Sequence, residues 1–240
     1  MIKKAIILAA GKSDRMMPLT ADRPKCLLEV AGKPIIQYQI DGLRAAGVQD
    51  ILMVVGYKKE KIIEVLGEGI RYRVYDDFAT TNNLYTLWSV ADELDRACLI
   101  TFADVICNPA LFTAIVKCDK EPFTLLVDTC EVRQNTMRVK FRGPFITEIG
   151  NHISIQDGQG IFLGVAAVNK EGTDLLKPQL TQLAVSAGHE SDYWTSVINV
   201  LAASGIFVCA LSINNFWMEV DTPEDLAFVR SLFSGSAKIA

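Results

Sequence analysis

The sequence has few histidines and no closely spaced pair of cysteines. Its two histidines, His152 and His189, stand in loop-like stretches without the spacing of metal ligands. The six cysteines are scattered without a C-x-x-C pair, and several lie in apolar runs. Such cysteines are typical of a reduced interior, so we expect a cytoplasmic protein. A redox or hydrolytic enzyme is not favoured, because the sequence shows no pairing of a nucleophile with a base.

The chain also lacks an excess of positive charge and an unbroken apolar run of membrane length. Its formal net charge of -4 argues against a nucleic-acid surface, which needs a basic stripe. The apolar stretch 197–213 is broken by Asn199, Ser204 and Gly205, which argues against a membrane span. Residues 1–10 imitate a secretion signal, but their short apolar run leads directly into a glycine turn and is better interpreted as a strand. We therefore expect a small-molecule partner.

Neither an internal repeat nor a linker interrupts the 240 residues, of which 50% are hydrophobic, and we expect a single domain over 1–240. Strand and helix patterns alternate through the first half. Strands are predicted at 4–9, 51–55, 71–75 and 98–103, and helices from Pro34 onward, at 59–66 and at 84–94. This alternation predicts an α/β fold with a Rossmann-like, mostly parallel sheet flanked by helices.

The pattern changes near residue 120. Short strands separated by glycine-containing turns are predicted at 123–128, 137–142, 145–149 and 161–168. We expect them to form a β-rich flap inserted around 123–168, within a subregion of about 120–168. Helices near 170–183 and 191–203 and a strand at 206–211 follow. Thr222, Pro223 and Asp225 then have the residue types of an N-cap, a first-turn proline and an N3 carboxylate.

The amino-terminal segment joins a predicted strand to a glycine turn and two cations. Residues 5–8 indicate a strand buried on both faces, and Gly11 allows backbone to approach a ligand. Arg15 and Lys25 add positive charge, so the segment is suited to holding phosphate. Neither the P-loop pattern nor the G-x-G-x-x-G fingerprint fits, because the required glycines are missing.

This segment resembles the signature of sugar-nucleotide nucleotidyltransferases, L-A-A-G-x-G-[ST]-R-x-x-P-[LM]-T, followed by P-K and G-K-P. The matching residues include Arg15, Lys25 and the later stretch 32–35, whereas Ser13 and Asp14 replace the second glycine and the hydroxyl residue. The resemblance implies that Arg15 and Lys25 are catalytic. It also implies that the nucleotide is bound by Leu8, Ala9, Ala10 and Gly11.

Two carboxylates are metal-ligand candidates. Asp104 follows a predicted central strand, and Asp221 ends an extended segment just before a capped helix. Judged alone, Asp104 could equally form a turn and Asp221 could cap the helix. Two hard oxygen ligands suit Mg²⁺. The family resemblance implies that Asp104 and Asp221 hold this ion, with support from Glu219.

The segment 82–88 resembles that of phosphocholine cytidylyltransferases and their relatives that act on phosphonates. Asn82 and Asn83 offer amide donors and acceptors, as recognition of a cytosine edge requires. The alternative is that one of them caps the helix that begins near Leu84.

Two segments, around residues 133–138 and 192–193, contain candidate residues for binding the acceptor. Asp192 and Tyr193 resemble the family segment beside the aminoalkyl end of the substrate, although core packing of Tyr193 is an equal alternative. Met137 stands where phosphocholine enzymes have tryptophan, which favours a primary amine over choline. Arg133 and Arg138 are candidates to bind a phosphate or phosphonate, although exposed strand arginines are more often solvated.

Taken together, the resemblance implies a Mg²⁺-dependent enzyme that transfers CMP from CTP to a small phosphorylated or phosphonylated amine or alcohol and releases pyrophosphate. The acceptor would be similar to 2-aminoethylphosphonate or phosphocholine. A sugar- or inositol-1-phosphate nucleotidylyltransferase is the alternative enzyme, and a non-catalytic nucleotide sensor is the alternative from another class. A homodimer is compatible with the sequence, which does not fix the oligomeric state.

Overall fold

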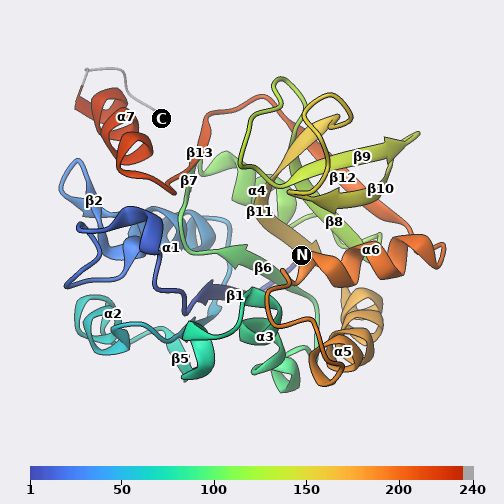
Figure 1. Ribbon diagram of the computed structural model, residues 1–240, viewed down its shortest axis with the longest axis horizontal. Helices are drawn as coiled ribbons and strands as arrows, with labels where there is room; N and C mark the ends of the chain where they lie inside the picture. The colour runs from blue at the N-terminus through green and yellow to red at the C-terminus, as the bar shows by residue number, and fades with distance from the viewer. Residues whose placement is uncertain (235–240) are drawn as a thin grey trace.

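The computed structural model describes residues 1–234, so the last six residues of the predicted domain lie outside the described residues. The predicted α/β fold is confirmed, since a central sheet is covered by helices on both sides (Figure 1). The helices are α1 (Ile35–Ala45), α2 (Lys59–Leu66), α3 (Asn83–Trp88), α4 (Ala110–Ile115), α5 (Lys170–Val185), α6 (Thr195–Ala203) and α7 (Pro223–Ser234). Within residues 1–234, no helix is long and apolar enough to span a bilayer.

The central sheet combines a parallel half with a more antiparallel half. Its strands lie in the order β5 (Arg71–Val74), β4 (Asp50–Val55), β1 (Lys4–Ala9), β6 (Cys98–Phe102), β11 (Gly160–Val168), β8 (Phe123–Asp128), β12 (Val208–Ile213), β10 (Phe145–Gly150) and β9 (Arg138–Arg142). The first four are parallel, as the βαβ pattern predicts. Short ribbons are formed by β2 (Glu29–Val30) with β3 (Lys33–Pro34), and by β7 (Val105–Cys107) with β13 (Trp217–Glu219).

The strand β11 connects the two halves of the sheet. Its carboxyl half pairs with β6, and its amino half pairs with β9, so that β11, β8, β12, β10 and β9 close into a ring. The register shifts between Phe162 and Ala166, around Gly164 at φ +78°. A Cβ on Gly164 would lie 2.6 Å from the Phe102 ring. The four predicted flap strands exist as β8, β9, β10 and β11, and all four belong to the nine-stranded sheet. The name flap is kept below for β9, β10 and their loops.

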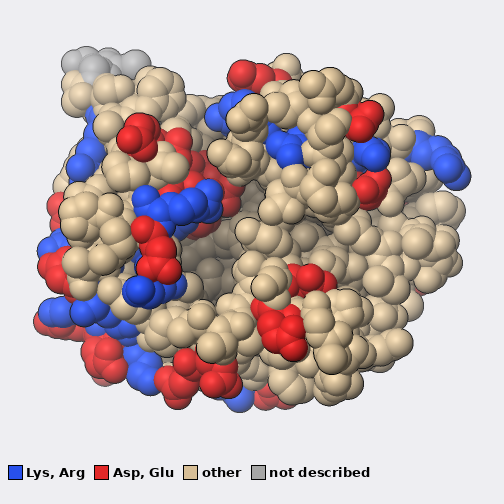
Figure 2. Space-filling view, viewed as in Figure 1, with Lys and Arg blue, Asp and Glu red and all other residues tan. Residues whose placement is uncertain are grey.

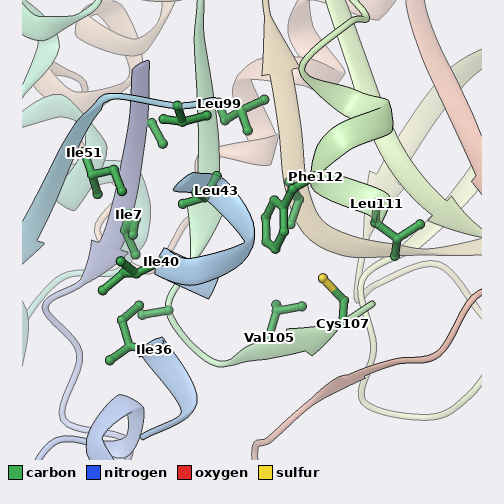
Figure 3. Close-up of a cluster of buried hydrophobic side chains, with 14 of the residues drawn as sticks. Ile7, Ile36, Ile40, Leu43, Ile51, Leu99, Val105, Cys107, Leu111 and Phe112 are labelled. Carbon is green, nitrogen blue, oxygen red and sulfur yellow. The ribbon is translucent and has the colours of Figure 1, made fainter. Parts of the chain in front are cut away.

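Successive residues of β1 supply the two faces of the core. Ala5, Ile7 and Ala9 pack on the side of α1 and α4, and the residues between them pack on the side of α3, α5 and α6. Figure 3 shows the first side, where Ile36, Ile40 and Leu43 of α1 lie against buried strand residues, beside Phe112 of α4. Burial on both faces explains why β1 is almost wholly apolar.

Two predicted helices are shorter than their sequence patterns. The pattern at 84–94 becomes α3 and a separate 3₁₀ turn at Ala91–Glu93. The pattern at 191–203 becomes α6, which begins at Thr195 because the preceding residues are held by other contacts. The backbone N–H of Asn82 donates to Glu190, and the side chain of Asn83 accepts from the N–H of Trp194. Tertiary hydrogen bonds therefore override helix propensity there.

A buried lysine begins β1, where an apolar residue would be expected. Lys4 is 1% exposed, and its Nζ lies 2.7 Å from Glu93 and 3.0 Å from Asp95. Arg71 binds the other oxygen of Glu93 at 2.7 Å. The hydrogen bond from Arg71 and the contact with Lys4 outweigh desolvation and lower the pKa of Glu93 to about 2. These ion pairs join β1, β5 and the 3₁₀ turn after α3.

We predict that Glu93→Gln lowers the free energy of unfolding at neutral pH. Because folding depresses the carboxyl pKa from 4.5 to about 2, its contribution is complete above pH 4.5 and is lost as the pH falls toward 2. Urea unfolding should therefore show a gap between wild type and variant that closes over this range. Glu171→Gln, at an exposed site on α5, serves as the control. A gap that is constant with pH would contradict the linkage.

We also predict that Gly42→Ala destabilises the protein, although alanine favours helix by up to about 1 kcal/mol. The new Cβ would lie 2.6 Å from Cδ2 of Phe112, whose ring is buried and has little room to move. Overpacking of this kind costs about 1–3 kcal/mol, so the loss should exceed the gain. In urea unfolding, the penalty should shrink in a Phe112→Leu background, and equal penalties in both backgrounds would refute the explanation.

Candidate active site

A cavity of about 500 Å³ opens at the carboxyl ends of β1 and β6, where open α/β sheets bind ligands. One wall is formed by the loop after β1, and the opposite wall by the flap around β9. Figure 2 shows a hollow at the centre of this face, with Lys, Arg, Asp and Glu side chains gathered on its left rim. The cavity therefore has a strongly charged side.

The predicted phosphate loop lines this cavity through Leu8, Ala9, Ala10 and Gly11. A Cβ added to Gly11 would meet no atom within 4 Å, so the backbone here is open to a ligand. Ser13, which replaces the second family glycine, adopts the left-handed conformation at φ 59° and ψ 54°. This costs a serine roughly 1–2 kcal/mol. The glycine-like turn is therefore kept without the glycine.

The short ribbon of β7 and β13 brings the distant acids together. Glu219 pairs with Val105, and the N–H of Val220 donates to the carbonyl of Asp104 at 3.0 Å. The carboxylate oxygens of Asp104, Glu219 and Asp221 lie within 4.8 Å of one another. These three residues are called the acidic cluster below.

The alternative role of Asp221 as a helix cap is filled by other residues. Thr222 Oγ1 accepts from the N–H of Asp225, and the Asp225 carboxylate accepts from the N–H groups of Thr222 and Asp221 at 2.8 and 3.0 Å. This reciprocal capping box confirms the predicted start of α7. The side chain of Asp221 is thereby left to face the cavity.

Lys25 lies between the two predicted metal ligands. Its Nζ is 2.6 Å from Asp104 Oδ2 and 2.7 Å from Asp221 Oδ1, and Arg15 Nη2 is 2.9 Å from the same Asp221 oxygen. Burial opposes the charge of Lys25, but the two carboxylates outweigh it and raise its pKa. Burial likewise opposes the charge of Asp221, but Lys25 and Arg15 outweigh it and lower its pKa. Lys25 and Asp221 therefore stay charged at neutral pH.

The acidic cluster suits a divalent cation. Burial raises the pKa of Glu219 well above its usual value, and the neighbouring Asp104 and Asp221 raise it further. The cluster therefore has more carboxyl groups than the single positive charge of Lys25 can balance. Asp104 Oδ1 is buried and has no hydrogen-bond partner among the described residues. Clustered carboxylate oxygens with an open coordinating atom are the donors that Mg²⁺ takes in phosphate-binding sites.

Asn82 and Asn83 both line the cavity, and their side chains also hold the neighbouring loop. Asn82 caps α3, because its Oδ1 accepts from the N–H of Asn83 at 2.7 Å, while its Nδ2 donates to the carbonyl of Ser191 at 3.1 Å. Asn83 Oδ1 accepts from the N–H of Trp194 at 2.8 Å. The capping alternative is thus correct for Asn82, and base recognition stays a prediction.

The structure places Arg138, one of the five residues predicted on the acceptor side, in the cavity wall and separates the other four. Met137 and Tyr193 line the cavity. The Asp192 carboxylate lies outside its lining and contacts His189 Nδ1 at 2.8 Å. Arg133 also lies outside, with its guanidinium 5.2 Å from the ring centre of Trp217. Of these four, the cavity wall therefore includes only the first two, and the binding roles of all four stay predictions.

Sequence reasoning missed Gln39, a buried residue that supports the site from α1. Its Nε2 donates to the carbonyl of Phe102 at 2.9 Å, and its Oε1 accepts from Thr101 Oγ1 at 3.2 Å. These contacts fix the end of β6, just before Asp104. The sequence does contain an indication of this role. Gln39 falls within the apolar stripe of Ile36, Ile40 and Leu43, and a polar residue on a buried face needs a hydrogen-bond partner.

Three cytidylyl-transferring relatives are similar to this chain, two of them over most of its length and one over less than half. Choline-phosphate cytidylyltransferase of Streptococcus pneumoniae is 44% identical over 99 residues, which cover 40% of this chain and 43% of that protein. CTP:phosphoglutamine cytidylyltransferase of Campylobacter jejuni is 26% identical over 252 residues, which cover 92% and 97%. CMP-5'-(3-aminopropyl)phosphonate synthase of Streptomyces rubellomurinus is 27% identical over 92% of this chain and 37% of its own length.

Solved structures agree with these sequence relationships. CTP:phosphocholine cytidylyltransferase from Streptococcus pneumoniae superposes with a TM-score of 0.83 at 27% identity, over 98% of this chain and 100% of that one. The inositol-1-phosphate CTP transferase from T. maritima shares the fold, with a TM-score of 0.79 at 19% identity.

The family model for the MobA-like NTP transferase domain matches residues 5–146, more than half of the chain. The matched segment contains the phosphate loop, Lys25 and Asp104, on which the sequence resemblance was based. The chain therefore belongs to the family of MobA-like NTP transferase domains and is a nucleotidyltransferase.

Proposed function

We propose that this protein transfers a cytidylyl group from CTP to a small phosphorylated or phosphonylated amine or alcohol and releases pyrophosphate. The observation that carries the proposal is the position of Lys25 between Asp104 and Asp221, with Arg15 on the same carboxylate, beside the phosphate loop. Support for CTP and for this acceptor class comes from relatives named for phosphocholine, phosphoglutamine and aminopropylphosphonate.

The reaction forms one phosphorus–oxygen bond and breaks another. An anionic oxygen of the acceptor attacks the α-phosphorus of CTP, and the bond to the bridging oxygen breaks as pyrophosphate leaves. The attacking oxygen is already charged, so no general base is required, and catalysis depends on positioning and neutralisation of charge. Arg15 and Lys25 bind the triphosphate and neutralise the charge that moves onto the leaving pyrophosphate.

Asp104 and Asp221 would hold Mg²⁺, with Glu219 beside them. When bound, Mg²⁺ would withdraw charge from phosphate oxygens and align the two reactants. Lys25 bridges the two aspartates, and Gln39 holds the strand end from which Asp104 projects.

The flap side favours an acceptor with a primary amine or a hydroxyl group. Met137 lines the cavity at the position where phosphocholine enzymes have tryptophan, and a thioether offers a quaternary ammonium no aromatic face. Tyr193 supplies a ring on the neighbouring wall, and Asp192 lies next to it in the chain. We therefore rank 2-aminoethylphosphonate-like acceptors above phosphocholine.

We predict that Asp104→Asn lowers kcat by about 10²-fold or more while CTP binding changes little, because the carboxylate acts on charge that develops during transfer. Pyrophosphate release gives the rate, and calorimetry in EDTA gives the CTP affinity. Asp174→Asn, on the exposed face of α5, is the control. Near-normal turnover of Asp104→Asn would exclude its metal role.

We further predict that CTP outcompetes UTP, ATP and GTP in pyrophosphate release. Among acceptors, 2-aminoethylphosphonate should give the highest kcat/KM, followed by phosphoethanolamine and phosphocholine. Fastest turnover of inositol or hexose 1-phosphates would replace the proposal with the sugar-type activity. Nucleotide binding without turnover of any acceptor would indicate a sensor.

A further inference from the structure

Arg138 differs from the other buried cations of this protein. In the part of the chain that the structure describes, three cationic side chains are buried: Lys4, Lys25 and Arg138. Lys4 pairs with Glu93 and Asp95, and Lys25 pairs with two members of the acidic cluster. Arg138 is 7% exposed, yet among residues 1–234 it forms no ion pair.

Main-chain carbonyls hold the guanidinium of Arg138 in place. Its Nε donates to Ile153 at 2.5 Å, one terminal nitrogen to Asn151 at 2.5 Å, and the other to Arg133 at 3.0 Å. A guanidinium has five N–H donors, so these three bonds leave one N–H on each terminal nitrogen. The contacts orient the side chain and join the two loops that flank β9 and β10.

Neutral carbonyls do not cancel a full positive charge. A buried cation without a counter-ion is costly, and proteins normally pair it or use it to bind an anion. Arg138 lines the cavity on the flap side, opposite the phosphate loop. An anion that enters the cavity would therefore find an oriented, largely desolvated guanidinium.

The surrounding wall contains no competing acid. Asn135, Thr136, Met137 and Asn151 line this side and are all uncharged. The carboxylates that line the cavity, within the described residues, are those of the acidic cluster, which already contacts Lys25 and Arg15. The flap wall is thus a cationic site surrounded by neutral hydrogen-bonding groups.

We propose that Arg138 binds an oxyanion of the acceptor, either the attacking phosphate or phosphonate or a carboxylate elsewhere in the same molecule. The proposal rests on the proposed function, because it assigns the flap side of the cavity to the acceptor. Guanidinium suits both groups, since its planar fork matches paired oxygens. The bond is non-covalent and requires no co-reactant.

Steady-state kinetics with two acceptors distinguish the two sources of the anion. 2-Aminoethylphosphonate carries only the phosphonate, and 2-amino-3-phosphonopropionate adds a carboxylate. For Arg138→Gln we expect acceptor KM to rise about 10- to 100-fold, the range for a charged hydrogen bond, with CTP KM little changed. Arg138→Lys should recover part of the loss. Arg142→Gln, at the exposed end of β9, is the matched control.

The pattern of KM identifies the group. An equal rise for both acceptors assigns Arg138 to the phosphonate, and a rise confined to the carboxylated acceptor assigns it to the carboxylate. An unchanged acceptor KM, or an equal rise in KM for CTP and for the acceptor, would show that Arg138 only supports the flap structurally. Either result would overturn the proposal.

A second variant avoids removing the carbonyl contacts. Asn151→Asp adds an anion at a cavity-lining residue whose own carbonyl touches Arg138, and it should lower acceptor affinity about tenfold by competing for the guanidinium. Gln182→Glu, at an exposed position of α5, makes the same charge change elsewhere. Calorimetry in the presence of CTP and EDTA measures acceptor binding without turnover. It therefore tests whether Arg138 binds the acceptor even if transfer to these acceptors fails. Equal affinities in Asn151→Asp and wild type would contradict the assignment.

Discussion

The ion pairs of Lys25 with Asp104 and Asp221 are the interaction on which the rest of the site depends. They join side chains that are 79 and 196 positions apart, at contacts of 2.6 and 2.7 Å. Without the lysine, three half-buried carboxylates within 4.8 Å would repel one another. With it, Asp104 and Asp221 share one cation beside the loop that follows β1. In the proposed reaction, the lysine that joins these two aspartates also neutralises the triphosphate.

The fold delivers these groups through β1, β6 and the ribbon of β7 and β13. The strand β1 starts at the buried ion pairs of Lys4, crosses the core and ends at the phosphate loop. Its neighbour β6 ends just before Asp104, held by Gln39, and the ribbon brings Glu219 and Asp221 to the same point. On the opposite wall, β11 bends at Gly164 and joins the flap to the sheet. The cavity thus lies between a charged side and a flap whose two loops are joined by Arg138.

Many elements of the fold and part of the site could be predicted from sequence, because they depend on the residues of a single segment. The strands and helices of the first half followed hydrophobic periodicity, and the start of α7 followed from Thr222, Pro223 and Asp225. The phosphate loop matched a long ordered motif, and Asp104 followed a predicted central strand. Long-range contacts could not be read in this way. Three features depend on segments that meet only after folding: the late start of α6, the carbonyl shell of Arg138 and the stacking of Arg133 on Trp217. Asp192 likewise lies outside the cavity lining, although the adjacent Tyr193 is in it.

The most direct test of the central claim is Mn²⁺ binding, measured by electron paramagnetic resonance in the presence of CTP. If the acidic cluster grips a cation beside the triphosphate, wild type should bind stoichiometric Mn²⁺, and both Asp104→Asn and Asp221→Asn should bind it at least about tenfold more weakly. Equal Mn²⁺ affinity in wild type and in both variants would show that the cluster does not hold the ion and would contradict the account.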